Sequence, residues 1–267
     1  MNRTFPFFIE ITSLQGLLLR EFRAALINRY FQVFAVLSLL GGVMAIFFSE
    51  TANAIGFFVV QIAIFLVSLF ALLAGVSSAQ AEREEWQLMF SQPVPRAAYV
   101  IGKFITYLSI FAGVLLLLIL PALFSGTPAQ QIMILYVQTL LLAAAFLALG
   151  LAVGFLAHDG AQALILGATA WLFMLFGVDL AGLFIARFEF MQKMPDLWVS
   201  MLMLNPLDAF RIHALFALEQ IPAEAANKTP LANWWITHAG FWFSVVAMLW
   251  SVSLIALTGF RLSKLEE

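Results

Sequence analysis

Six long apolar stretches constrain this chain more than any other feature of its sequence. A helix that crosses a lipid bilayer needs about 20 consecutive, mostly apolar residues. Hydrophobic residues make up 63% of the chain and charged residues 10%, whereas about a quarter of a soluble domain is charged. The sequence therefore predicts an all-α polytopic membrane protein, with residues 1–267 forming a single transmembrane domain. The six expected transmembrane helices are 31–48, 56–76, 104–124, 132–157, 163–185 and 238–260.

The chain has few of the residues that support catalysis or metal binding. It contains no cysteine, which excludes disulfides, thiolate metal sites and cysteine nucleophiles. Its three histidines fall at membrane boundaries, so we expect no Ser–His–Asp arrangement. A net charge of -2 without a Lys/Arg-rich run gives no indication of nucleic-acid binding. We expect no catalytic residue, metal or cofactor in this chain, although an integral-membrane enzyme of unknown chemistry stays an alternative.

A charged island, residues 79–103, separates the second and third apolar stretches. Its acidic first part predicts a short helix with an apolar far face, and two prolines then force an extended break. Such a hairpin is suited to contact a protein outside the membrane, although an ordinary solvated loop explains the same pattern. The candidate docking residues are Glu82, Arg83, Glu84, Glu85, Trp86, Phe90, Pro93 and Arg96.

Residues 12–28 predict an interfacial helix ahead of the first transmembrane helix. Its apolar stripe includes Phe22 and Leu26, and Glu21 lies away from that stripe. The segment is too charged to span a membrane and apolar enough to lie in the headgroup plane.

Lysine and arginine accumulate at one end of the expected bundle. The short loops at the other end, near Glu50 and Gln130, carry none. Because cytoplasmic loops are enriched in these residues, we expect both termini and the charged island to face the cytoplasm. The cations on this side are Arg3, Arg20, Arg23, Arg29, Arg83, Arg96, Lys103, Arg261 and Lys264.

The long segment 187–235 is predicted to form short amphipathic helices on the outer, periplasmic side, interrupted at Asn205-Pro206. Asn205 suits a helix N-cap and Pro206 a first helical position. Asp208 would then lie in the first turn, with Arg211 as its ion-pair partner at i+3. The same motif is equally compatible with a docking surface for a periplasmic protein. That surface would consist of Asn205, Pro206, Asp208, Arg211 and His213.

Three further features concern the transmembrane helices and the outer segment. Asp179 is the one acid well inside an apolar stretch; such a charge is a functional candidate by default, but its place near the outer end favours a structural or interfacial role. Gly150 and Gly154 form a small-xxx-small face typical of close helix packing. Methionine thioethers favour Cu(I) but are also ordinary filler in amphipathic helices, the interpretation that we favour. The outer methionines are Met191, Met194, Met201 and Met203.

Together these features resemble the permeases of type-2 ABC exporters. The shared features are the interfacial helix, six transmembrane helices, a Glu-rich cytoplasmic hairpin ending PVPRAAYVIGK, and an outer helical segment before the last transmembrane helix. Within that family, the stretch LNPLDAFR is similar to the N-P-x-D-x-x-R motif of permeases that serve nitrous-oxide-reductase maturation, a copper-site assembly process. One departure lies in the cytoplasmic hairpin, where Glu84-Glu85 stands in place of the Gly-Thr pair expected ahead of the hairpin's leucines.

The resemblance implies a homodimer in a bacterial inner membrane, bound to two copies of a separate cytoplasmic ATPase. This chain has no Walker A glycine-rich loop, so ATP and Mg²⁺ would bind the ATPase. Residues 82–90 would be the coupling helix and residues 12–28 a second contact. A periplasmic accessory protein is a further implied partner, and membrane lipids surround the chain. A generic exporter of a lipid or small molecule is the alternative within the family.

Overall fold

The computed structural model describes residues 19–23, 26–48, 52–81, 96–125, 128–185, 187–217 and 230–264, and the elements that it describes are helices. Six of these helices are long and apolar enough to cross a membrane, which confirms the all-α prediction. The six candidate transmembrane helices are Arg29–Phe47, Ala54–Ala81, Ala97–Phe124, Ala129–Leu156, Gly160–Ile185 and Ala239–Ser263.

The first, fourth and sixth transmembrane helices are regular, and the other three change helix type along their length. The regular ones are α2 (Arg29–Phe48), α7 (Ala129–Leu156) and α14 (Ala239–Ser263). The second is α3 (Ala52–Ile62), the π-helical turn η1 (Ala63–Val67) and α4 (Ser68–Ala81); the third is α6 (Arg96–Ile119) and the 3₁₀ segment η3 (Leu120–Ser125); the fifth is α8 (Gly160–Leu172), the π-helical turn η4 (Phe173–Gly177) and α9 (Val178–Ile185). The outer segment contains α10 (Glu189–Lys193), α11 (Pro195–Leu204), α12 (Pro206–Ala217) and α13 (Pro230–Thr237).

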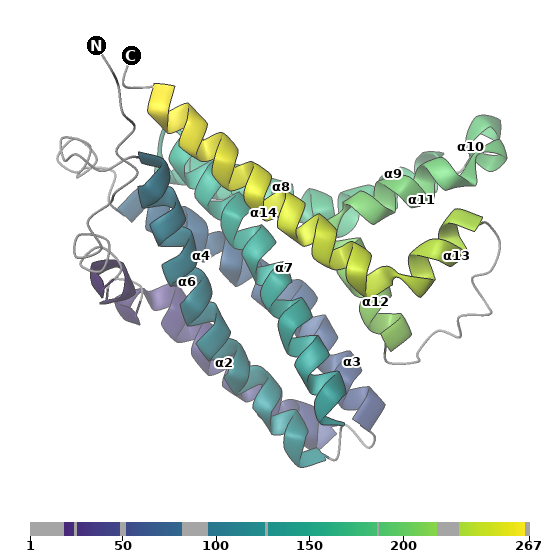
Figure 1. Ribbon diagram of the computed structural model, residues 1–267, viewed down its shortest axis with the longest axis horizontal. Coiled ribbons are helices and arrows are strands. Elements are labelled where there is room, and N and C mark those ends of the chain that lie inside the picture. Colours follow the sequence, from purple (N-terminus) through teal and green to yellow (C-terminus); the bar gives the residue numbers. More distant parts are fainter. Residues whose placement is uncertain are drawn as a thin grey trace, which may run out of the picture.

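Helix α7 forms the centre of the bundle, with α4, α6 and α14 packed around it (Figure 1). Its transmembrane segment is 78% buried. The closest approach is to α4, where a Cβ atom added to Gly150 would overlap the carbonyl oxygen of Leu72. A Cβ atom on Gly154 would lie 2.6 Å from the Cβ atom of Ala79. The two backbones can therefore touch only because these positions are glycine, which confirms the packing role predicted for Gly150 and Gly154.

The fifth transmembrane helix is the least buried of the six, with only 17% of its segment inside the protein. In Figure 1, α8 lies behind α14 and α9 leads away from the bundle toward α10 and α11. The Nε1 atom of Trp171 on α8 donates a hydrogen bond of 2.8 Å to the hydroxyl of Ser68 on α4. Ser68 in turn donates to the carbonyl oxygen of Ile64 within η1. The π-helical turn η1 of the second transmembrane helix therefore lies beside the point where the fifth transmembrane helix is attached to the bundle.

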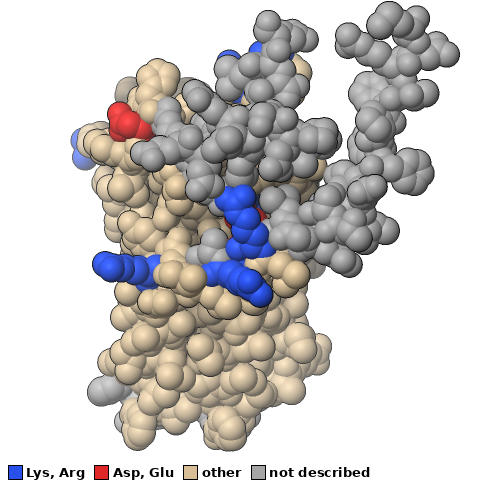
Figure 2. Space-filling view, turned by 90° about the vertical axis from the view of Figure 1, so that its left-hand side faces the viewer, with Lys and Arg blue, Asp and Glu red and all other residues tan. Residues whose placement is uncertain are grey.

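The beginning of α6 and the end of α14 lie at one end of the bundle, and α12 and α13 lie toward the other (Figure 1). Figure 2 shows the face that carries the beginning of the described chain, where Lys and Arg side chains gather in a band. Below that band the described surface on this face is uncharged. An uncharged belt next to a cationic band is the surface expected where a bilayer meets its aqueous boundary.

Candidate functional site

A polar site is built where α11 ends and α12 begins. Asn205 lies between the two helices, and its Oδ1 atom accepts a hydrogen bond of 3.2 Å from the backbone N–H of Leu207. Pro206 is the first residue of α12. This is the N-cap geometry predicted from the sequence, in which a side-chain oxygen satisfies a free N–H group of the first helical turn.

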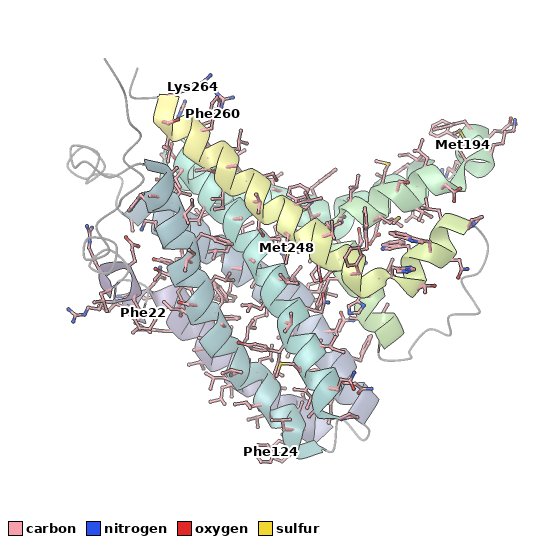
Figure 3. The ribbon with its side chains drawn as sticks, viewed as in Figure 1. Phe22, Phe124, Met194, Met248, Phe260 and Lys264 are labelled. Carbon is pink, nitrogen blue, oxygen red and sulfur yellow. The ribbon has the colours of Figure 1, made fainter. Side chains whose placement is uncertain are left out.

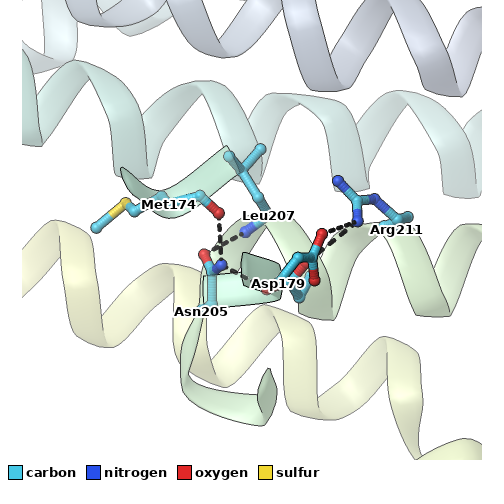
Figure 4. A network of polar contacts seen from close by, with 6 residues as sticks. Met174, Asp179, Asn205, Leu207 and Arg211 are labelled. Atoms are coloured by element: carbon cyan, nitrogen blue, oxygen red, sulfur yellow. Dashed lines mark hydrogen bonds and ion pairs between the residues drawn. The ribbon is translucent and has the colours of Figure 1, made fainter. Parts of the chain in front are cut away.

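The amide nitrogen of Asn205 connects the cap to two further groups. It donates to the carbonyl oxygen of Met174 at 2.7 Å and to the Oδ2 atom of Asp208 at 2.5 Å (Figure 4). Met174 belongs to the π-helical turn η4 in the fifth transmembrane helix. Turns of this kind are often placed at functional sites, where they alter the regular backbone hydrogen bonding. A single side chain therefore ties α11, α12 and the fifth transmembrane helix together.

Arg211 joins two carboxylates that are far apart in the sequence. Its Nη1 atom lies 3.2 Å from the Oδ2 atom of Asp179 on α9 and 3.5 Å from the Oδ1 atom of Asp208 (Figure 4). The i+3 pair with Asp208 was predicted, whereas the shorter pair with Asp179 was not. The sequence placed both groups toward the outer end of the membrane, and this shared depth was the only indication of the contact.

Burial differs sharply among the members of this network. The side chain of Asp208 is 4% exposed, that of Arg211 29% and that of Asp179 47%. Burial, followed by the nearby charge of Asp179, raises the pKa of Asp208 to about 6, against the opposing effects of Arg211 and Asn205. Asn205 and Asp208 are buried, so of these four residues the Arg211 and Asp179 side chains are the ones within reach of a partner.

His213 turns toward α14 and away from the network. A Cβ atom added to Gly240 would lie 2.7 Å from its Cε1 atom, and burial lowers the pKa of His213. The ring lines a cavity of about 60 Å³ between α7 and α12 together with Gln131 and Gln138. The Oε1 atom of Gln138 is buried with no hydrogen-bond partner in the described structure. A cavity of this size and polarity is large enough for a few water molecules.

Two tryptophans of α14 hold the end of α11 in place. The Nε1 atom of Trp242 donates to the carbonyl oxygen of Met203 at 2.8 Å, and that of Trp250 donates to the carbonyl oxygen of Leu204 at 3.0 Å. The last carbonyl groups of a helix have no partner within it, so these donors act as a C-terminal cap from another helix. Neither role was predicted from the sequence, because nothing local links α14 to α11.

The outer methionines are divided between core and surface. Met203 is buried in the hydrophobic core, whereas Met194 and Met201 are about half exposed. Met194 lies at the far end of the arm formed by α9 to α11 (Figure 3). Within the described residues, no group of three or more His, Asp or Glu side chains is placed to hold a metal ion.

The structure also fixes the surroundings of the predicted docking hairpin. Residues 82–95, which include Glu82, Arg83, Glu84, Glu85, Trp86, Phe90 and Pro93, lie outside the described residues. Arg96 begins α6, and α4 extends to Ala81. Part of the segment 79–103 assigned to the hairpin therefore belongs to the helices on either side of it.

Two side chains near the beginning of the described chain, those of Glu21 and Asn28, contact the transmembrane helices that flank residues 82–95. The Nζ atom of Lys103 on α6 lies 2.7 Å from the Oε2 atom of Glu21, and both side chains are buried. Asn28 donates a 3.3 Å hydrogen bond to Ser77 on α4. Glu21 was expected on the polar side of an interfacial helix and Lys103 among the cytoplasmic charges. Neither expectation indicated that the two charges neutralise each other inside the protein.

The aromatic surroundings of Lys103 complete this inner site. Its Nζ atom lies 5.2 Å from the ring centroid of Tyr99 and 5.9 Å from that of Tyr107. Ring faces attract a cation, so the ammonium group is held by the carboxylate and by two rings one helical turn away on either side.

Residues 25–260 match the sequence model of a family described as ABC-2 family transporter protein. The chain belongs to this family. A comparison with curated proteins finds no significant match. Membership makes the chain the membrane permease of an ABC transporter, a subunit type without catalysis of its own, and so removes the alternative of an integral-membrane enzyme.

Proposed function

We propose that the chain couples ATP hydrolysis in a separate cytoplasmic ATPase to transport, or to mechanical work, on the outer side of the membrane. The observation that carries the proposal is the family match over residues 25–260. The working unit is two copies of this chain with two ATPases, which bind ATP and Mg²⁺. The sparsely buried fifth transmembrane helix offers the membrane surface that a second copy needs.

We place both termini and the segment 82–95 in the cytoplasm of a bacterium, with the chain in its inner membrane. The concentration of Lys and Arg at one end of the bundle supports this orientation. Arg20, Arg23, Arg29, Arg261 and Lys264 are all exposed, as expected for groups that meet water or lipid headgroups.

The route of coupling starts at the hairpin between α4 and α6. An ATPase that moves this hairpin moves both helices, and the Glu21–Lys103 and Asn28–Ser77 contacts carry Glu21 and Asn28 with them. Packed helices transmit such displacements as rigid bodies between discrete arrangements. The α11–α12 junction at the other end, held by Asn205, is the place where the displacement reaches the outer side.

The more specific role that we propose is in nitrous-oxide-reductase copper-site maturation. It is supported by the stretch LNPLDAFR, whose Asn, Asp and Arg residues join one polar network. Arg211 is then the group offered to a periplasmic accessory protein. A generic exporter of a lipid or a small molecule is the alternative, because the family includes transporters of varied cargo.

The experiment that tests the proposal is purification of the intact complex from its native membrane, followed by identification of its partner chains. We expect two permeases and two P-loop ATPases, with ATP hydrolysis by the complex. A strictly monomeric permease with one ATPase would contradict the homodimer. Loss of the copper site from nitrous oxide reductase in a strain without this chain supports the specific role, and a fully loaded reductase contradicts it.

A further inference from the structure

An apolar groove of about 430 Å³ runs along the surface between α6 and α14. Its α6 wall includes Ala97, Ile101 and Ile105, and its α14 wall includes Val252, Ala256 and Phe260. The residues on each wall are four apart, so they lie one above another on a single helix face. Both helices are transmembrane helices, so the groove opens toward the hydrocarbon part of the bilayer.

The groove exists because small residues bring the two helices together at its inner end. A Cβ atom added to Gly259 would lie 3.2 Å from the Cβ atom of Ala97. Larger side chains then rise on both sides, and Ile105, Val252 and Phe260 are each more than half exposed. The result is a groove with a closed floor and apolar walls.

The chemistry of the groove fits a hydrocarbon chain. Ser251 is the one hydroxyl residue in its lining, and its Oγ atom already donates to the carbonyl oxygen of Ala247 at 2.7 Å. An occupant therefore needs no hydrogen-bonding group along this length. From Ser251 to Phe260 the groove follows about 14 Å of helix, at 1.5 Å per residue. That length is about half of the roughly 30 Å hydrocarbon core of a bilayer, which is the depth of one leaflet.

The inner end of the groove is positively charged. Lys264 lies one helical turn beyond Phe260, on the same face of α14, and its Nζ atom is 4.6 Å from the Phe260 ring centroid. Arg261 is exposed at the same end. Figure 3 shows Phe260 and Lys264 together at the C-terminal end of α14. Cations at the level of the headgroups attract anionic phospholipids by about 1 kcal/mol each.

We propose that this groove is a binding site for one anionic phospholipid of the surrounding leaflet, with an acyl chain between α6 and α14 and the phosphate at Lys264 and Arg261. The lipid is a resident of the permease and is not its cargo. The proposal rests on the groove and its charge, and it stands whether or not the role in copper-site maturation is correct.

The test is native mass spectrometry of the purified, delipidated complex, titrated with phosphatidylglycerol or with phosphatidylcholine of the same acyl chains. We expect one phosphatidylglycerol held by each permease, more tightly than phosphatidylcholine. Lys264→Ala should weaken phosphatidylglycerol binding about fivefold and leave phosphatidylcholine binding unchanged. The matched control is Lys193→Ala, which removes an exposed cation at the outer side and should change neither.

Groove-filling variants test where the acyl chain lies. Ala256→Phe and Ile101→Trp each fill the groove from one wall at an exposed position, and both should reduce retention of either lipid. Leu249→Phe, at an exposed site of α14 outside the lining, should not. Undiminished lipid retention by both groove-filling variants would overturn the proposal. Loss of the permease dimer in these variants would also overturn it, because a second copy of the chain would then occupy the groove. Release of the lipid when ATP is added would overturn it as well, because the lipid would then be cargo.

Discussion

The Nζ atom of Lys103 lies 2.7 Å from the Oε2 atom of Glu21, and neither side chain is exposed to solvent. The pair joins the beginning of the described chain to the helix that follows the predicted docking hairpin. Removing one partner of a buried ion pair leaves an uncompensated charge inside the protein, which costs more than the pair itself contributes. Substitution of one partner should therefore lower the stability of the permease more than substitution of both, and this difference can be measured.

We predict that Lys103→Met lowers the free energy of unfolding by about 3–5 kcal/mol. The double variant Glu21→Leu with Lys103→Met should recover most of that loss, because it leaves no buried charge. Denaturant unfolding of the purified permease in detergent measures both. Lys193→Met, at an exposed position of α10, is the control and should have little effect. A single Lys103 variant as stable as the parent would mean that the buried pair is not formed.

The hairpin prediction concerns residues whose structure is not described, but its test is direct. Reversing Glu82, Glu84 and Glu85 to lysine should abolish co-purification of the ATPase or uncouple its ATP hydrolysis, because the proposed contact depends on this acidic segment. The permease itself should stay folded in detergent. Glu189→Lys, at an exposed acid of the outer helix α10, controls for the added charge. If the triple reversal gives a fully coupled complex, the segment is an ordinary loop.

How much of the protein was predictable depends on how local each feature is. The six transmembrane helices follow from hydropathy, because lipid offers the backbone no hydrogen-bond partner and forces long apolar helices. The Asn205 cap follows from residues two positions apart. By contrast, the contacts Arg211–Asp179 and Lys103–Glu21 join different helices, and a single sequence does not state which helices pack together. The π-helical turns η1 and η4 likewise depend on tertiary packing.

Asn205→Ala should destabilise the permease by about 2 kcal/mol, because it removes a helix cap and leaves the carbonyl oxygen of Met174 without its donor. Thermal unfolding in detergent measures the loss. Ser200→Ala is a suitable control, since that exposed serine bonds only within its own helix, to the carbonyl oxygen of Asp196. Equal effects of the two substitutions would show that Asn205 does not hold α12 to the fifth transmembrane helix.

Asp208 should make the stability of the permease depend on pH. The folded state holds its pKa at about 6, above the ordinary value of 3.8, so it binds the proton more tightly than the unfolded state does. The stabilisation from protonation is complete below about pH 4 and is lost as the pH rises through about 6, a change of about 3 kcal/mol. Asp208→Asn should flatten this part of the stability curve, measured by denaturant unfolding between pH 4 and 7. Asp179 and Arg211, the charged groups that face Asp208, are unchanged in that variant. If the stability curve of Asp208→Asn keeps its full slope, the pH dependence does not come from Asp208.

The last prediction separates a structural from a docking role for Arg211. As a structural residue, Arg211 only balances the negative charges of Asp179 and Asp208. Substitution of either partner of the Arg211–Asp179 pair should then cause a similar, small loss of stability, because the pair is partly exposed. As a docking residue, it offers its guanidinium group to the periplasmic accessory protein, and Asp179 merely orients it. Arg211→Gln should then abolish binding of that protein, whereas Asp179→Asn, which keeps the cation, should retain it.

Binding is measured by capture of the co-purified accessory protein on the immobilised complex, with the bound ATPase as the internal control for an intact permease. Arg211→Glu should give the same loss as Arg211→Gln, at a further cost in stability, because it places a third acid beside the buried Asp208. If both substitutions of Arg211 leave capture of the accessory protein unchanged while Asn205→Ala still lowers the unfolding temperature, the motif is a helix cap with its ion pair, and the docking surface must be sought elsewhere on α10 to α13.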